Sequence, residues 1–575
     1  MSNHTYKLLI SFVVISTQLL NVMGQNPLNI PNALTGTNFN LTIQSGNSSF
    51  YPGTTTPTYG INGIWMAPTI IVNKGDSITL NVTNNLSTST TIHWHGLHVA
   101  PQNDGGPHQL INPATTWSPS FKVLNNAGTF WYHPHGLNKT DLHVSKGIAG
   151  FFIIHDAAET TLNLPHTYGI DDFPIVVQSK SFDILQQIAI ATEMDTAIFV
   201  NGTLHPYQNI PSQVVRLRLL NGSSMRAYNF GFTANLPFKL IATDAGLIDS
   251  AITLTRILLS PGERVEILLD LQGKNGDTIF LKNFSSEIPN GVYGAATVTG
   301  MGGATITGYD QNPLNGLDYN ILQLNIVGQT TTPIPITTIP TTLVTNTPWD
   351  VSLINDTKNF RLAPESMGPT FMVQGPFRID GVNFDMDSIN RICYLNNIEK
   401  WRWTNNTSLA HPIHIHDMYF YILNINGGAV PNYEQGKKDV VLIMPGQYVE
   451  FITKFEDFAD NDIPYMYHCH LLHHEDDGMM GSFIVRQYRQ GLYNISTNSN
   501  YEIYPNPSTN IWTIRSYDNE EILSYQLYDT YGRIVREAQT NNIEIQVENK
   551  LLNNGLYSLK IFTKLNSYSF NLIKN

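Results

Sequence analysis

Four short histidine-rich segments constrain the fold of this chain more than any other feature. Each contains two histidines separated by one residue: His93-Trp94-His95, His133-Pro134-His135, His414-Ile415-His416 and His468-Cys469-His470. Side chains on a strand alternate between its two faces, so we expect both imidazoles of a pair to point the same way. Four such pairs suit a shared metal cluster. A lone pair is more often structural, but four pairs together favour metal binding.

The last segment continues beyond its histidine pair as His468-Cys469-His470-Leu471-Leu472-His473-His474-Glu475-Asp476-Asp477-Gly478-Met479. On a strand, Cys469 would point away from its two histidine neighbours, so one backbone segment could serve two metal sites. Two His, one Cys and a weak axial Met form a blue-copper site. Cys469, His474 and Met479 would supply three of these ligands, and His411 the fourth. For this segment alone, the alternative is a structural zinc site or a chance histidine cluster in a loop.

The four motifs, HxH, HxH, HxxHxH and HCHxxxHxxxxM in this order, resemble those of the multicopper oxidases, and specifically the bacterial three-domain group of laccases, copper-efflux oxidases and spore-coat laccases. The resemblance implies four copper ions as cofactors. It assigns the type 1 copper to His411, Cys469, His474 and Met479, and the type 2 copper to His93 and His414. The two type 3 coppers would take His95, His133 and His470 in one case and His135, His416 and His468 in the other. His473 is expected to be a neighbour and not a ligand.

Two acidic residues match positions that deliver protons in the family. Asp104 follows the first motif in Asn103-Asp104-Gly105-Gly106, and the resemblance places it near the type 2 copper. Glu475 directly follows His474 and would lie near the type 3 pair. The alternative for both is an ordinary turn residue, and Asp before two glycines is a common turn sequence.

Short runs rich in Val, Ile, Thr, Phe and Tyr, separated by Gly, Pro and Asn, predict an all-β chain. Its 575 residues allow three or four domains. The resemblance implies three cupredoxin-like Greek-key β-sandwich domains at 30–156, 165–328 and 348–490, with a Thr/Pro-rich linker at 329–347. The middle domain carries no copper motif and is expected to serve as a scaffold. The copper cluster would then lie between the first and third domains.

The two ends of the chain indicate export. Residues 1–24 have the pattern of a signal peptide, with an apolar run too short for a convincing membrane span, and no other segment reaches that length. Residues 500–575 resemble the type A sorting domain of the type IX secretion system, a small β-sandwich, through Tyr504-Pro505-Asn506-Pro507 and Gly555-Leu556-Tyr557. The alternative is an extra β-domain that binds carbohydrate or partners. We expect a secreted or cell-surface protein that the type IX machinery handles.

The chain has only two cysteines, Cys393 and Cys469. A disulfide between them would consume the copper thiolate, so Cys393 is expected to be a small core residue. The net charge of −13 and the isoelectric point near 5.7 argue against nucleic acid as a partner.

The resemblance implies a laccase-type enzyme that couples four one-electron oxidations of phenols or aromatic amines to the reduction of dioxygen to water. One alternative is a metal oxidase that acts on Cu(I) or Mn(II) in copper tolerance. Others are a copper-binding surface or electron-transfer protein without turnover, and a copper nitrite reductase. The last lacks the HCH motif, and a mere carrier would need only the type 1 ligands.

Overall fold

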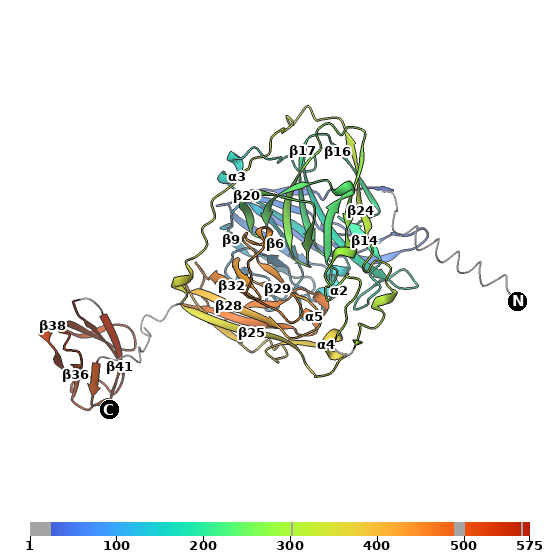
Figure 1. Cartoon of the computed structure of the whole chain (residues 1–575). Helices are drawn as coiled ribbons and strands as arrows, with labels where there is room; N and C mark the ends of the chain where they lie inside the picture. The colour runs from blue at the N-terminus through green and yellow to red at the C-terminus, as the bar shows by residue number, and fades with distance from the viewer. Residues whose placement is uncertain (1–24, 301–302, 488–500, 565–566) are drawn as a thin grey trace. The chain divides into compact units, whose positions relative to one another are not determined.

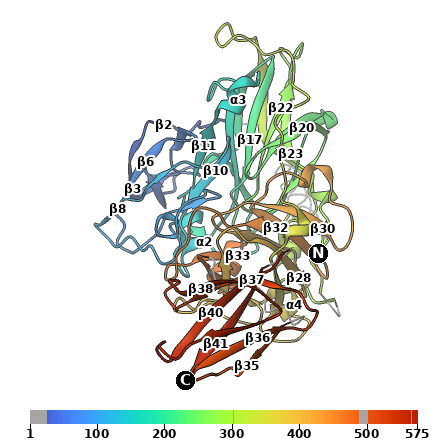
Figure 2. The same ribbon diagram turned by 90° about the vertical axis from the view of Figure 1, so that its left-hand side faces the viewer.

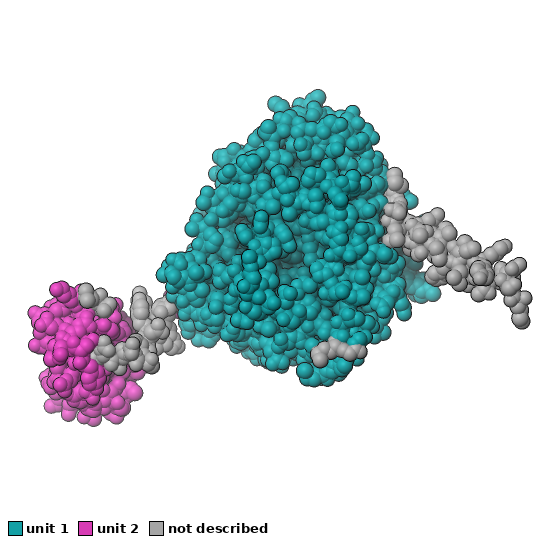
Figure 3. Space-filling view, viewed as in Figure 1, with its two compact units in different colours: residues 1–486 teal, residues 487–575 magenta. Residues whose placement is uncertain are grey.

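The computed structural model describes residues 25–300, 303–487, 501–564 and 567–575. The chain divides into two compact units, Met1–Arg486 and Gln487–Asn575 (Figure 3). Strands dominate both units, so the prediction of an all-β chain is confirmed. The predicted signal peptide at 1–24 lies outside the described residues. In the described part of the chain, no helix is both long and apolar enough to cross a membrane.

The first sandwich contains two sheets, with strand orders β2-β5-β11-β10-β7 and β4-β3-β6-β8, and β9 pairs with β6. Their bounds are β2 Ala33–Thr35, β3 Asn38–Ser48, β4 Thr56–Ile61, β5 Thr69–Asn73, β6 Ser77–Asn84, β7 His93–His95, β8 Thr116–Trp117, β9 Ser120–Lys122, β10 Gly128–His133 and β11 Gly150–His155. In β6, Ile78, Leu80 and Val82 alternate with more exposed residues and enter the core, as the period of a half-buried strand requires. β7, which carries the first histidine pair, lies at the edge of its sheet.

The second sandwich contains two sheets. One has the strand order β15-β14-β12-β17-β22-β19-β20, and β13 pairs with β12; the other has the order β1-β16-β24-β23-β18-β21. The bounds are β1 Asn26–Pro27, β12 Asp172–Phe182, β13 Ile188–Ala189, β14 Ala197–Val200, β15 Thr203–Leu204, β16 Pro206–Pro211, β17 Val214–Asn221, β18 Tyr228–Phe232, β19 Phe238–Thr243, β20 Gly246–Leu254, β21 Ile257–Leu259, β22 Arg264–Asp270, β23 Thr278–Asn283 and β24 Tyr319–Val327. β1 pairs with β16, so the first described residues belong to the second sandwich, although they precede the first sandwich in the sequence.

The third sandwich contains the sheets β26-β25-β28-β32-β30 and β27-β34-β33-β29-β31 (Figures 1 and 2). The bounds are β25 Asp356–Pro364, β26 Phe377–Ile379, β27 Arg391–Tyr394, β28 Ile398–Asn405, β29 His411–Ile415, β30 Phe420–Ile425, β31 Val440–Ile443, β32 Tyr448–Lys454, β33 Tyr465–Cys469 and β34 Met480–Arg486. β29 and β33 are antiparallel neighbours, and His414 lies opposite His468. The third and fourth motifs are therefore side by side.

Short helices connect the strands. They are α2 Thr140–Ser145, α3 Ala157–Thr161, α4 Phe371–Gln374 and α5 Leu472–Asp476, and the 3-10 turns η1 Pro101–Asn103, η2 Thr233–Asn235, η3 Ser285–Glu287, η5 Tyr309–Gln311, η6 Val351–Leu353 and η7 Asn432–Glu434. The predicted linker packs on the second sandwich, where Ile336 and Leu343 join the core. The predicted limits of the three domains stay predictions, because the compact division falls only between residues 486 and 487.

The second unit is a small sandwich with its own core, which includes Trp512, Leu527 and Leu559. Its sheets are β35-β36-β39 and β38-β37-β40-β41, with bounds β35 Tyr501–Tyr504, β36 Ile511–Ser516, β37 Ile522–Tyr528, β38 Ile534–Asn542, β39 Glu544–Glu548, β40 Gly555–Phe562 and β41 Ser567–Lys574. The predicted small C-terminal β-sandwich is confirmed.

Candidate metal centre

The four histidine motifs meet between the first and third sandwiches. His93 on β7 lies opposite His133 on β10, and the ring of His93 stacks on that of His416, with centroids 3.8 Å apart. Both members of the first pair lie on a strand, but His135, His416 and His470 each fall just beyond the strand that carries their partner. These three pairs therefore do not lie wholly on a strand, but the rings of each pair stay close, with centroids 6.3 Å apart for His133 and His135, 5.0 Å for His414 and His416, and 5.5 Å for His468 and His470. The two members of a pair can join different groups even from one strand, as His93 and His95 do.

One group of three imidazoles contains His95, His133 and His470. The Nδ1 atom of His95 lies 3.3 Å from the Nε2 atom of His133 and 3.3 Å from that of His470. The Nδ1 of His133 is 2.8 Å from the carbonyl oxygen of Pro134. Donation to this carbonyl places the ring proton on Nδ1 and leaves the Nε2 lone pair for a metal.

A second group contains His135, His416 and His468. The Nε2 atom of His468 lies 3.1 Å from that of His135 and 3.3 Å from that of His416. The two groups share no residue, and each contains the three histidines that the family resemblance assigns to one type 3 copper.

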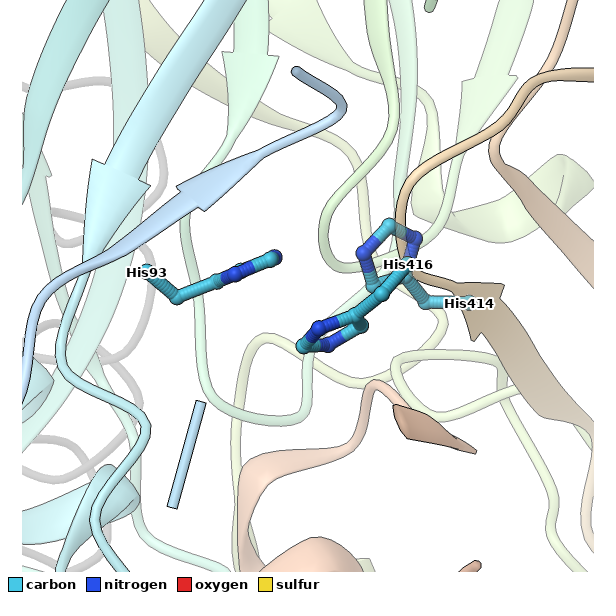
Figure 4. Close-up of side chains that lie close together, drawn as sticks. All are labelled: His93, His414 and His416. Atoms are coloured by element: carbon cyan, nitrogen blue, oxygen red, sulfur yellow. The ribbon is translucent and has the colours of Figure 1, made fainter. Parts of the chain in front are cut away.

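His93 and His414, the predicted type 2 ligands, each have a buried Nε2 atom with no hydrogen-bond partner. Their Nδ1–H groups donate to the backbone oxygens of Asp104 at 2.9 Å and Asp439 at 2.8 Å. Figure 4 shows His93 reaching towards His414 and His416 from a separate segment of chain. A buried nitrogen without a partner is costly, so these two lone pairs fit a bound cation.

The Cys469 sulfur lies 3.4 Å from the Nδ1 of His411 and 3.8 Å from that of His474. All three residues are buried. Met479 is also buried, and its backbone N–H donates to the His474 carbonyl at 2.9 Å while its carbonyl accepts from the Cys469 N–H at 3.1 Å. The ring of Phe377 packs against both imidazoles, with centroid distances of 4.8 and 4.7 Å.

Burial sets the protonation of these donors. It lowers the pKa of His411 and of His133 to about 3 and raises that of the Cys469 thiol. Neutral imidazoles are the form that binds metals, and a thiol loses its proton when it coordinates one. Imidazole and thiolate together suit copper better than a hard cation such as Mg²⁺ or Ca²⁺. The donor set therefore fits copper.

Both predicted acidic residues contact the imidazole groups. The Asp104 carboxylate accepts from the Nδ1 of His416 at 2.8 Å and lies 3.4 Å from that of His93. The Glu475 oxygens lie 3.3 and 3.2 Å from the Nδ1 atoms of His135 and His468. These imidazoles, together with the Thr140 hydroxyl at 2.7 Å, lower the pKa of Glu475 to about 2 against the opposing effect of burial. Simple turn positions do not explain these contacts.

The structure adds residues that the motifs do not contain. Asp439 lies 3.3 Å from the Nε2 of His95, and its two carboxylate oxygens each accept from Arg264 at 2.6 Å. Arg264 begins β22 of the second sandwich, and nearby Gly262, with φ of +88°, lies so close to His470 that a Cβ would come within 2.9 Å of its ring. The predicted scaffold therefore also touches the centre. The run Pro261-Gly262-Glu263-Arg264 resembles the family's middle domain, but it carries no metal-ligand pattern of its own.

Both cysteines are free and buried. Cys393 lies in the core of the third sandwich, as predicted.

Comparison with known proteins agrees with this centre. Sequence models described as multicopper oxidase match residues 42–159 and 346–489, and one described as a secretion system C-terminal sorting domain matches 502–575. The chain is 32% identical over 459 residues to the multicopper oxidase mco of Staphylococcus haemolyticus, which covers 78% of this chain and 88% of the relative. It is 28% identical over 474 residues to the cell division protein FtsP of Dickeya dadantii, covering 80% and 93%.

Solved structures show the same architecture. The laccase-like multicopper oxidase CueO from Ochrobactrum sp. has a TM-score of 0.70 and 30% identity, over 80% of this chain and 100% of that one. McoA from Aquifex aeolicus has a TM-score of 0.69 and 26% identity, over 81% and 100%. These likenesses confirm the predicted cupredoxin-like fold. The chain belongs to the multicopper oxidase family and carries a C-terminal sorting domain of the type IX secretion system.

Proposed function

We propose that this chain is a laccase-like oxidase that couples four one-electron oxidations of a phenol or aromatic amine to the reduction of dioxygen to water. The observation that carries the proposal is the joint presence of four buried donor groups. One is the thiolate group of His411, Cys469 and His474, and three are imidazole groups: His93 and His414 with His416, His95 with His133 and His470, and His135 with His416 and His468. Relatives of similar identity include a cell division protein, so family membership alone does not carry the activity.

Each donor group has a proposed part. His411, Cys469, His474 and Met479 would hold a type 1 copper, His93 and His414 a type 2 copper, and the remaining six histidines two type 3 coppers. Bound copper would supply one-electron chemistry at the thiolate group and dioxygen reduction at the imidazole groups. Cys469 is peptide-bonded to His468 and His470, which belong to different imidazole groups. The backbone thus joins the thiolate to both groups through a few covalent bonds.

The two carboxylates would handle protons. The Asp104 carboxylate accepts a hydrogen bond from the Nδ1–H of His416. Glu475 lies between His135 and His468, and the Thr140 hydroxyl donates a further hydrogen bond to it. Carboxylates in these positions orient the imidazoles and can pass protons to the space that the imidazoles enclose.

The surface beside the thiolate group favours an uncharged organic substrate. The Thr407 hydroxyl lies 2.9 Å from the Nε2 of His411 and borders an open cleft of about 630 Å³. The described residues that line it bear no charge, and include Asn290, Met372, Ser408 and Pro445. Such a surface offers an uncharged aromatic molecule apolar contacts and hydrogen bonds, but offers Mn(II) no carboxylate.

Oxygen uptake by the copper-loaded chain with a phenol, with Cu(I) and with Mn(II) tests this function. We expect the phenol to give the fastest uptake. Faster uptake with either metal ion would favour the alternative of a metal oxidase in copper tolerance. No uptake with any reductant would favour a copper-binding surface protein.

Glu475→Gln is expected to slow oxygen uptake by about a hundredfold or more, because the amide cannot pass a proton as the carboxylate can. The blue absorption should persist, since the carboxylate contacts His135 and His468 and not the thiolate group. Asp477→Asn changes an exposed acid two residues away and should leave both properties unchanged. Loss of the blue band in Glu475→Gln would instead make Glu475 a structural support for His474.

The sorting domain indicates that the protein is exported. We propose that the mature enzyme is secreted or held at the cell surface, after handling by the type IX machinery.

A further inference from the structure

A cleft of about 610 Å³ lies where the three sandwiches meet, and none of its lining residues belongs to the donor groups. The first sandwich and the segment after it supply Lys74 and Asp156, and the second supplies Leu247. Residues 342–347 form another wall, and the third sandwich supplies Tyr419, Tyr421 and Lys437. Cavities of this size hold small organic ligands.

Lys437 is the unusual residue of this cleft. It is only 8% exposed, and its ammonium has no hydrogen bond or ion pair with any described residue. It lies 4.8 Å from the centre of the Tyr419 ring. The adjacent Lys438 is buried with anionic partners, because its ammonium pairs with Glu263 at 2.6 Å and with Glu434 at 3.3 Å. Lys437 therefore presents to the cleft an ammonium that has no anion among the described residues, and a ligand can supply one.

The other charges near Lys437 do not supply that partner. Burial, and then the charge of Lys74, lower the pKa of Lys437, while Asp156 and Asp249 oppose this effect. Both oxygens of Asp156 already accept backbone N–H groups, at 2.9 and 2.8 Å. One oxygen of Asp249 accepts two hydrogen bonds from Asn346, at 2.9 and 2.8 Å. Lys74 also lines the cleft and donates to the Asn126 side-chain oxygen at 2.6 Å, so neither lysine has an ion pair among the described residues and both can contact an anion in the cleft.

Aromatic rings form part of the same wall. The rings of Tyr419 and Tyr421 lie 5.8 Å apart and nearly perpendicular, at 88°. Trp349 packs on both, with centroids at 5.2 and 5.7 Å, which fixes their positions. Rings held at such angles favour stacked or edge-to-face contact with another ring.

We propose that this cleft binds a small aromatic carboxylate, with its carboxylate between Lys437 and Lys74 and its ring against Tyr419 and Tyr421. This site is separate from the metal centre, and its existence does not depend on oxidase activity.

The test uses 4-fluorobenzoate, which is followed by ¹⁹F NMR as the full chain is added. We expect saturable binding, and we expect Lys437→Gln to raise the dissociation constant at least about tenfold, because a charge-assisted contact is lost. Lys437→Arg keeps the charge and should bind within about threefold of the parent chain. Lys239→Gln removes a lysine of the second sandwich whose ammonium donates to the Thr253 hydroxyl outside the cleft, and it should have no effect.

Several results would overturn the proposal. If 4-fluorobenzamide binds as tightly as 4-fluorobenzoate, the cleft does not recognise the charge. If inorganic phosphate competes as well as unlabelled benzoate does, the cleft does not recognise the ring. Unchanged binding in Lys437→Gln would place the ligand elsewhere. If this variant unfolds, Lys74→Gln, at the other lysine of the cleft, carries the same test, and its failure to weaken binding would reject the site.

Discussion

Cys469→Ser is expected to abolish the blue absorption and to reduce oxygen uptake with a phenol to the background level. The Cys469 sulfur is the only thiolate donor in the buried group with His411 and His474. A serine hydroxyl is a hard, weakly acidic donor and does not replace a thiolate in a blue-copper site. The three imidazole groups contain no cysteine, so they should still bind copper. We therefore expect the copper content to fall by about one ion per chain.

Cys393→Ser is the matched control. Cys393 is also free, fully buried and part of the third sandwich, but it belongs to no donor group. The same chemical change there should keep the copper content, the colour and the oxygen uptake. Equal losses in both variants would attribute the effect to core packing, and retained uptake in Cys469→Ser would contradict the proposed role of the thiolate.

Arg264→Leu is expected to destabilise the first unit by about 3–5 kcal/mol, because it leaves a buried carboxylate without its cation. Both Arg264 and Asp439 are buried, and two contacts of 2.6 Å join them. Asp439 also lies 3.3 Å from His95, so copper binding at the imidazole groups should weaken as well. The midpoint of denaturant unfolding and the retained copper content measure the two effects.

Two variants show whether the buried charge is the cause. Arg256→Leu breaks a more exposed pair with Glu287, and should change the free energy of unfolding by less than about 1 kcal/mol. The double variant Arg264→Leu/Asp439→Leu removes both charges and should recover much of the lost stability. A loss in the double variant as large as in Arg264→Leu would reject the explanation.

The sequence predicts the donor groups well because the motifs themselves contain the donors. It predicts less about the local backbone of each pair, since His135, His416 and His470 lie just beyond the strands that carry their partners. The contact between Arg264 and Asp439 joins residues 175 positions apart, and neither stands in a local metal-binding pattern. Lys437 could not be identified either, because its lack of a partner depends on how the three sandwiches meet around it.

The most direct test of the central claim is the copper content of the purified, copper-loaded chain, measured together with its blue absorption and its oxygen uptake with a phenol. The arrangement of one thiolate group and three imidazole groups predicts about four copper ions per chain, a blue band and steady oxygen uptake. A single copper ion per chain, with no oxygen uptake after loading, would contradict it.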